Sequence, residues 1–235
     1  MKKLIMLAAA ALLTFGMVSC DKDDDTTNND NTTTTGETRG EWVNLGLPSG
    51  LLWYSVNIGA TSPEGYGDYY AWGETRTKDV YSWDTYTYGD YDSENGYTLY
   101  KYNTKSDYGT VDSKTTLESS DDVATQVLGN GARIPTKAEW QELLDNTTAE
   151  WTTVNGVYGC KYTATNGNSL FLPAAGYRYG SELSYAGSLG YYWSASLYES
   201  YPFSAWGMNF YSDYQNVSNY YRLYGQSVRT VCSQN

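Results

Sequence analysis

The chain has 235 residues and a formal net charge of −12, with 15 Lys and Arg, 27 Asp and Glu, and no His. The acidic balance argues against nucleic acid or an anionic membrane surface as a partner, and the lack of His removes the commonest general base and metal ligand near neutral pH. Tyr is abundant at 26 residues, with 8 Trp and only 4 Phe, so most rings carry a polar group that suits half-exposed strands and contact surfaces.

Residues 1–20 have the pattern of an export signal peptide. Lys2 and Lys3 form a basic start, and the apolar run 4–13 is shorter than the roughly 20 residues that a membrane-spanning helix needs. The motif Met-Val-Ser-Cys that ends at Cys20 resembles the lipobox of bacterial lipoproteins, in which the Cys becomes a lipidated N-terminus. The resemblance implies lipid attachment at Cys20 and anchoring in the outer membrane. The alternative is an ordinary cleaved signal peptide.

Residues 21–40 are predicted to form a flexible tether. They contain almost no apolar side chain, so they cannot bury enough surface to offset the entropy lost on ordering. The acidic start of the tether, 21–25, is typical of a solvated spacer. It also resembles the surface-export signal that follows the lipidated Cys of outer-membrane lipoproteins. That resemblance implies a protein that faces the cell exterior, with the periplasmic face as the alternative.

The remaining residues, 41–235, suit one domain. Its first strands are predicted at 42–45 and 51–57, joined by the turn residues 48–50. Residues 61–75 are expected to form a loop that leads into a buried strand around Tyr69 to Trp72.

Residues 76–130 hold many Tyr residues among Asp, Gly, Ser and Thr, without a clear period. A long, loop-rich segment is therefore predicted. One short helix is expected within it, capped by Ser120, Asp121 and Asp122 and ended by Gly129. The two Asp residues are also a weak candidate for calcium binding, and a solvated helix start is the preferred interpretation.

The clearest helix signal lies around Trp140. Thr136 and Glu139 form a capping box, in which each side chain accepts from a backbone amide of the first turn, and Pro135 prevents the helix from starting earlier. Trp140 and the leucines three and four residues later form one apolar stripe. We expect a helix from about 137 to 145 whose Trp140 enters a core made mostly of strands.

Three strands are predicted after this helix, at 150–154, 157–163 and 169–172. They are separated by Asn155-Gly156 and Asn166-Gly167. Asn-Gly pairs are a strong hairpin signal because both residues accept the positive φ of a type I′ turn. The pattern predicts an antiparallel meander.

Five ordered motifs carry a family resemblance. They are Asn44–Gly50, Gly67–Thr75, Arg133–Trp140, Leu172–Arg178 and Gly190–Ser194. Together they resemble the FISUMP-type major paralogous domain of bacterial surface lipoproteins, and the helix motif is also similar to the formylglycine-generating-enzyme branch of the C-type-lectin-like fold. The resemblance covers roughly residues 42 to 232. It implies an α+β, C-type-lectin-like fold, mostly antiparallel β with one or two short helices and long loops.

Cys160 and Cys232 are the cysteines that remain once Cys20 is lipidated. In an oxidising compartment such residues often pair. A disulfide between them closes a loop of about 70 residues, worth about 4 kcal/mol in the chain-entropy model. Two buried thiols are the alternative.

The C-terminal segment 176–235 is predicted to contain strands at 191–196, 205–211 and 226–232. Tyr, Asn, Ser and Asp dominate the residues between and along them, as in antibody paratopes, where rings give contact area at low entropic cost and amides and hydroxyls give adaptable hydrogen bonds. Tyr and Trp faces also stack on sugar rings. We therefore expect a binding face for a protein or a glycan, with a half-exposed sheet without a partner as the alternative. Its residues are Tyr198, Tyr201, Trp206, Asn209, Tyr211, Asp213, Tyr214, Asn216, Asn219, Tyr220, Tyr221 and Tyr224.

Segment 198–224 also resembles the output of diversity-generating retroelements. These elements mutate adenines in the C-terminal part of C-type-lectin-like proteins and scatter codons into Tyr, Asn, Ser and Asp. The stretch 226–229 would then be the fixed closing strand.

No catalytic residue, metal site or cofactor is predicted. The sequence has no phosphate-binding loop and no zinc-type Cys spacing, and the Glu-Pro-Asn and Trp-Asn-Asp calcium signatures of C-type lectins are absent. Cys160 and Cys232 do not match the reactive Cys pair of formylglycine-generating enzymes. Three functions stay open: a surface-exposed binding module, a structural or assembly component of the cell surface, and, more remotely, an unrecognised enzyme.

Overall fold

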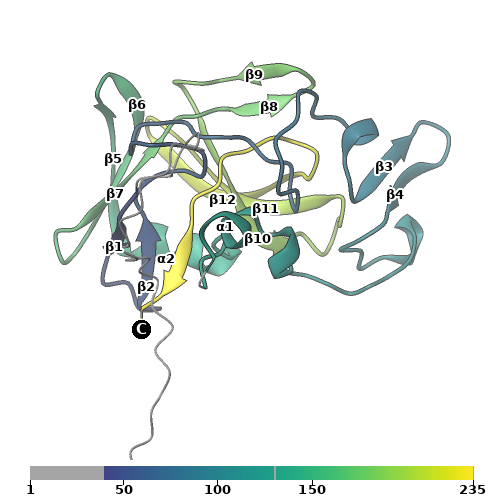
Figure 1. Ribbon diagram of the computed structural model, residues 1–235, viewed down its shortest axis with the longest axis horizontal. Coiled ribbons are helices and arrows are strands. Elements are labelled where there is room, and N and C mark those ends of the chain that lie inside the picture. The colour runs from purple at the N-terminus through teal and green to yellow at the C-terminus, as the bar shows by residue number, and fades with distance from the viewer. Residues whose placement is uncertain (1–39, 130, 235) are drawn as a thin grey trace, which may run out of the picture.

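The computed structural model describes residues 40–129 and 131–234 (Figure 1). The expected signal peptide 1–20, the lipid attachment at Cys20 and the tether up to residue 39 lie outside the described residues. Among the residues described, no helix combines the length and apolar character that crossing a bilayer requires.

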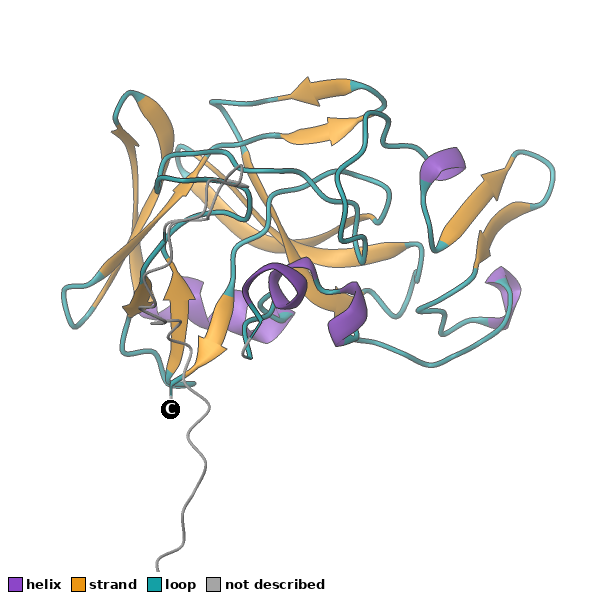
Figure 2. Ribbon diagram, viewed as in Figure 1, coloured by secondary structure: helices purple, strands orange, loops and turns teal. Residues whose placement is uncertain are grey.

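Antiparallel pairing of short strands dominates the fold, and the helices are few and short (Figure 2). The predicted antiparallel, β-rich class with short helices is therefore confirmed. The strands are β1 Trp42–Asn44, β2 Leu51–Tyr54, β3 Gly89–Asp92, β4 Gly96–Leu99, β5 Thr147–Val154, β6 Val157–Ala164, β7 Ser169–Pro173, β8 Tyr177–Tyr179, β9 Glu182–Ser184, β10 Gly190–Leu197, β11 Ser204–Tyr211, β12 Tyr214–Tyr221 and β13 Val231–Ser233. The α-helices are α1 Val123–Leu128 and α2 Lys137–Asn146, and the 3-10 turns are η1 Trp83–Thr85, η2 Ser106–Tyr108 and η3 Ser119–Asp121.

The first sheet has the order β1-β2-β13, so it joins the two ends of the described chain. Both predicted N-terminal strands are confirmed, although β2 ends at Tyr54. The prediction of a closing strand over 226–232 is wrong for most of its length. Residues 226–230 form only isolated bridges, such as that of Gln226 to Tyr70, and regular pairing begins at Val231.

The predicted meander is confirmed as the sheet β5-β6-β7. Its first turn uses Asn155 at φ 49° and Gly156 at φ 81°, the positive backbone angles that the Asn-Gly pair indicated. β6 buries alternate residues, Tyr162 among them, against the main core.

The predicted helix is confirmed as α2, with the Thr136–Glu139 capping box present. The Thr136 hydroxyl accepts from the Glu139 amide at 3.3 Å, and the Glu139 carboxylate accepts from the Thr136 amide at 2.7 Å. Arg133 holds the same carboxylate with two N–H groups, at 2.6 and 2.7 Å. Trp140 is fully buried, as expected, and its Nε1 donates to the Trp193 carbonyl at 3.0 Å.

The central sheet has the order β10-β11-β12. The sequence predicted no strand at 214–221, yet β12 pairs with β11 along its whole length, from Ser204↔Tyr221 to Tyr211↔Tyr214. Within the described residues β12 pairs only with β11, so it is an edge strand, and its first three residues are exposed. Such an edge strand lacks the apolar alternation that marks a strand in sequence.

The loop-rich segment that begins at residue 76 contains the hairpin β3–β4, which projects at the right of Figure 1. α1 begins at the cap Asp122 and ends at Gly129, as expected. The expected strand at 69–72 is wrong: these residues are buried, but only Tyr70 forms a bridge. Trp72 packs against the central sheet, where its Nε1 donates to the Ser194 carbonyl at 2.8 Å, whereas Tyr69 packs in a separate cluster with Tyr81.

One alternative that the sequence left open is decided against a disulfide, and one expectation fails. Cys160 and Cys232 are both buried, and no disulfide joins them within the described residues. Cys160 lies on β6 in the β5-β6-β7 sheet, and Cys232 lies on β13 in the β1-β2-β13 sheet. Asp121 and Asp122 are not solvated but buried. Asp121 accepts from Lys101 and the Tyr102 hydroxyl, and Asp122 caps α1 and accepts from the Ile134 amide at 2.8 Å.

Candidate functional site: an aromatic groove at the end of the central sheet

The predicted binding residues are all at least partly exposed, but they do not form a single face. Neighbouring residues of a strand point to opposite sides of the sheet. The predicted set includes residues from both sides, such as Trp206 and Asn209 on β11 and the neighbours Tyr220 and Tyr221 on β12. The structure divides the set into three groups, at the hairpin tip, beside α2 and around a groove.

The hairpin-tip group surrounds the turn between β11 and β12. Tyr211 and Tyr214 stack across the strands, with ring centroids 5.0 Å apart and planes 17° apart. Asp213 lies in the turn, and Asn209 pairs with Asn216 further along the strands.

The second group lies beside the start of α2. The Trp206 ring packs edge-on against Tyr198, with centroids 4.9 Å apart. Lys137 places its Nζ 3.4 Å from the Trp206 ring centroid. Such a cation over an indole face is a favourable contact, so Trp206 already has a partner within the chain.

The third group lines an open groove of about 390 Å³ at the end of β12. Tyr201, Asn219, Tyr220, Tyr221 and Tyr224 were predicted, and Phe203 and Ser204 complete the lining. None of these side chains is charged at neutral pH. The groove therefore offers ring faces together with amide and hydroxyl groups.

Further rings beside the groove come from segments where the sequence analysis expected no site. Phe203 stacks on Tyr97 of β4, with centroids 4.3 Å apart and planes 18° apart. The ring centroid of Trp83 in η1 lies 6.4 Å from that of Tyr221. The ring centroid of Tyr179 in β8 lies 5.5 Å from that of Tyr224. The abundance of Tyr in 76–130 was the sequence feature that pointed to this side of the groove. Because these residues follow no period, the sequence did not show which of them would lie beside β12.

Six tyrosine rings are linked by successive pairwise contacts, and this set is here called the aromatic row. Its members, in spatial order, are Tyr91, Tyr97, Tyr221, Tyr224, Tyr177 and Tyr185, and successive centroids are 4.9, 6.4, 5.9, 5.2 and 6.0 Å apart. The row runs from the β3–β4 hairpin across β12 to the β8–β9 hairpin. Its end residues and its centre are exposed, with Tyr91 46%, Tyr221 40% and Tyr185 58% accessible.

Arg222 follows the groove residue Tyr221 in the chain and anchors the backbone beside the groove, and this anchored backbone is here called the groove floor. It is fully buried, and its guanidinium donates to the Tyr86 hydroxyl and to the carbonyls of Pro202, Tyr102 and Lys101 at 2.8 to 3.2 Å. It also lies 5.0 Å from the Trp72 ring centroid. The Arg222 side chain thus connects the end of β12 to Pro202 and to residues 101–102, which follow β4.

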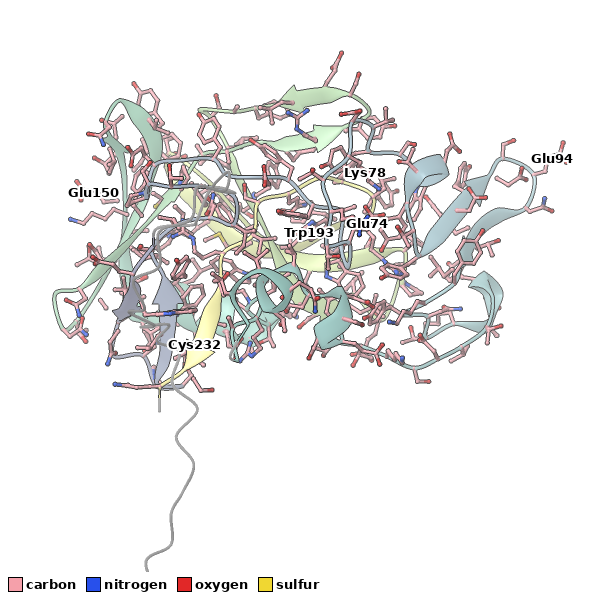
Figure 3. The ribbon with its side chains drawn as sticks, in the orientation of Figure 1. Glu74, Lys78, Glu94, Glu150, Trp193 and Cys232 are labelled. Atoms are coloured by element: carbon pink, nitrogen blue, oxygen red, sulfur yellow. The ribbon has the colours of Figure 1, made fainter. Side chains whose placement is uncertain are left out.

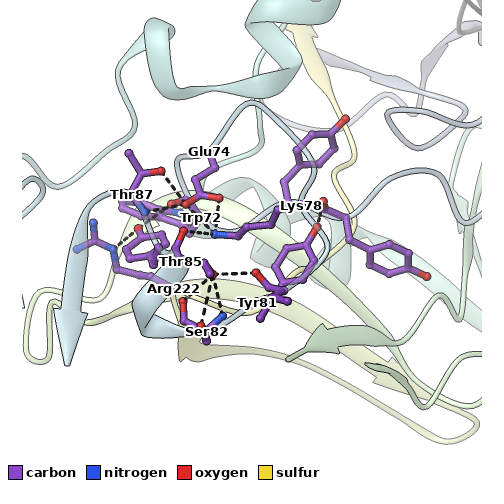
Figure 4. Close-up of polar contacts among 12 residues, drawn as sticks. Trp72, Glu74, Lys78, Tyr81, Ser82, Thr85, Thr87 and Arg222 are labelled. Atoms are coloured by element: carbon purple, nitrogen blue, oxygen red, sulfur yellow. Dashed lines mark hydrogen bonds and ion pairs between the residues drawn. The ribbon is translucent and has the colours of Figure 1, made fainter. Parts of the chain in front are cut away.

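Hydrogen bonds and an ion pair among Glu74, Lys78, Thr85 and Thr87, here called the polar clamp, hold η1 beside the groove (Figure 4). The Glu74 carboxylate accepts from the Thr87 amide at 2.8 Å and pairs with Lys78 at 2.7 Å. The Lys78 Nζ also donates to the Thr85 carbonyl at 2.9 Å. Figure 3 shows Glu74 and Lys78 between Trp193 of the central sheet and Glu94 at the tip of the β3–β4 hairpin. The clamp therefore holds the Trp83 side of the groove in place.

Three of the row tyrosines, Tyr97, Tyr177 and Tyr224, have raised pKa values. Burial, together with a hydrogen bond and repulsion from Tyr221, raises the pKa of Tyr97 to about 12. Burial also raises the pKa values of Tyr177 and Tyr224. These three phenol groups stay protonated at neutral pH and can donate or accept hydrogen bonds.

Metal ligation has no obvious location in the part of the chain that the structure describes: no group of three or more Asp, Glu, Cys or His side chains there is placed to hold an ion.

Residues 160–231 match the family model of a domain of unknown function, DUF8237. The match runs from β6 to the first residue of β13, so it includes the groove residues from Tyr201 to Tyr224 but not the β3–β4 hairpin. No curated protein and no solved structure matches the chain significantly.

Proposed function

We propose that the protein is a surface-exposed binding module that holds a protein or glycan ligand in the aromatic groove. The observation that carries this is the concentration of exposed, uncharged rings at one place on a fixed floor. Tyr201 and Tyr221 are 53% and 40% accessible, while Arg222, which follows Tyr221 in the chain and donates to the Pro202 carbonyl, is fully buried. Rigid aromatic side chains bind partners at low entropic cost when the surface is preorganised.

The location and family are part of the same proposal. The protein would be an outer-membrane lipoprotein, lipidated at Cys20 and facing the cell exterior, with a C-type-lectin-like fold of the FISUMP type. The antiparallel sheets with few short helices support that fold. β1 and β2 lie at the lower left of Figure 1, away from the β3–β4 hairpin. A tether that enters at β1 would leave the groove accessible.

An assembly role at the cell surface is the second candidate. One observation favours it: within the described residues, β12 pairs only with β11, so its other edge is open to a neighbouring strand. Unpaired strand edges are templates for association between chains. Under this alternative, substitutions on β12 would impair surface assembly and leave ligand capture unchanged.

The retroelement hypothesis is compatible with this proposal. Diversification would have to spare Met208, Phe210, Val217 and Arg222, which are buried, and act on exposed neighbours such as Tyr221. The neighbouring DNA tests it. A near-identical template repeat that differs only at adenines, beside a reverse transcriptase gene, would establish diversification, and a gene without such a repeat would end the idea.

The proposed function is tested with the soluble 41–235 fragment on a combined array of glycans and surface proteins. Tyr221→Ala is expected to weaken the captured ligand about tenfold or more, with an unchanged melting temperature. The matched control is Tyr158→Ala, because Tyr158 is also exposed, at 51%, but lies on β6 and stacks on Trp151. Equal loss in both variants, or loss in neither, would contradict a site in the groove.

A further inference from the structure

The aromatic row extends well beyond the groove. The groove lining includes Tyr221 and Tyr224, whereas the ring contacts of the row continue from Tyr97 to Tyr91 at one end and from Tyr177 to Tyr185 at the other. Both ends are at least as exposed as the centre. A ligand of one compact ring would leave most of this surface unused, so the shape favours an extended ligand.

The composition of the row favours a ligand with apolar faces and hydroxyl edges. All six members are Tyr rather than Phe, and each combines a ring face with a phenol group that donates and accepts hydrogen bonds. Asn219 and Ser204 add an amide and a hydroxyl beside the central rings. An apolar peptide anchor would gain nothing from these polar groups, whereas a sugar ring uses both its C–H face and its hydroxyl rim.

Charge narrows the ligand class further. The groove lining contains no Lys or Arg that would pair with a uronic or sialic acid, and no carboxylate that would pair with an amine. The chain as a whole carries a net charge of −12, which repels an anionic polymer.

We propose that the row binds an extended, uncharged oligosaccharide, with one sugar stacked at Tyr221 and further sugars toward Tyr97 and Tyr91 on one side and Tyr224 and Tyr177 on the other. This inference rests on the proposed function, because it assigns the ligand class of the same groove. Binding proceeds without a metal ion, since the lining offers rings, amides and hydroxyls and no carboxylate.

The test is calorimetric titration of the purified full chain with uncharged oligosaccharides of one to six sugars, from glucose, xylose, galactose and mannose series, in buffer with EDTA. Affinity is expected to rise with chain length, by about tenfold between the disaccharide and the pentasaccharide of the preferred series. Tyr221→Ala should weaken every length, while Tyr91→Ala should weaken only the longer members. Tyr221→Phe, which keeps the ring, should retain most of the affinity, and Tyr158→Ala should match the unaltered chain.

The outcomes separate the two proposals. Preference for charged oligosaccharides, affinity independent of length, or no binding of any uncharged member would overturn the inference. If a protein on the array instead binds in a Tyr221-dependent manner, the proposed function stands and the sugar assignment fails. If no captured ligand depends on Tyr221, both fail.

Discussion

Arg222 and Arg229 are fully buried, and neither forms an ion pair within the described residues. Arg229 donates to the Asn57 side chain and to the carbonyls of Tyr54 and Phe171. Burial lowers its pKa to about 10, which still leaves the guanidinium charged at neutral pH. A planar guanidinium satisfies several separate carbonyl groups at once, a task that a single ammonium group cannot perform. The two arginines therefore act as cross-links between segments distant in sequence.

Arg222→Lys is expected to destabilise the protein by about 2–4 kcal/mol. The lysine ammonium cannot reach the Tyr86 hydroxyl and the carbonyls of Pro202 and Lys101 together, so buried acceptors lose their donor. Urea unfolding followed by tryptophan fluorescence measures the change. Arg76→Lys is the control, because Arg76 is exposed. An unchanged unfolding midpoint for Arg222→Lys would show that the guanidinium does not hold the groove floor.

At the scale of single elements, the sequence predicted correctly those features that depend only on interactions between residues close together in the chain. The Thr136–Glu139 box and the Asn155-Gly156 turn each depend on a few consecutive residues, and the structure confirms both. β12 was missed because an edge strand needs no apolar alternation. The groove was half predicted: its β12 side has a distinctive composition, but Tyr97 reaches it only through tertiary packing.

The start of α2 is expected to lose stability in acid. Burial raises the pKa of Glu139, but hydrogen bonds from Arg133 and Thr136 outweigh it, and the net pKa lies below the ordinary value of 4.5. A depressed carboxyl pKa gives stability that is present above the unfolded pKa and is lost as pH falls through the folded one. Glu139→Gln should therefore be about 1–2 kcal/mol less stable at pH 7. Its melting temperature should also fall less than that of the unaltered chain between about pH 5 and pH 3.

Thermal melts at several pH values check this, with Glu150→Gln as the control. Glu150 is exposed on β5, and it is not the carboxylate that Arg133 holds. Parallel pH profiles for Glu139→Gln and the unaltered chain would show that Glu139 contributes no pH-dependent stability.

At the scale of the whole molecule, long-range pairing decides the fold. β13 closes the first sheet against β2, with Val231↔Trp53 and Cys232↔Leu52 in register, and α2 packs against the central sheet. Arg133 links the two regions: its backbone pairs with Val231, and its side chain holds Glu139 at the start of α2. These contacts predict that the first sheet and the central sheet unfold together.

Deleting residues from Val231 onward tests this. Val231 and Cys232 are fully buried, so their loss should cost about 3–5 kcal/mol, a large share of the 5–15 kcal/mol that typically stabilises a domain. The matched control is deletion from Ser233 onward, because Ser233 and Gln234 are exposed. That shorter deletion should cost less than about 1 kcal/mol. Both proteins are unfolded in urea, with tryptophan fluorescence and ligand capture recorded on the same samples. Coincident loss of the two signals is expected for one cooperative unit. Retention of ligand capture after the fluorescence change would mean that the aromatic groove folds independently of the sheet that joins the chain ends.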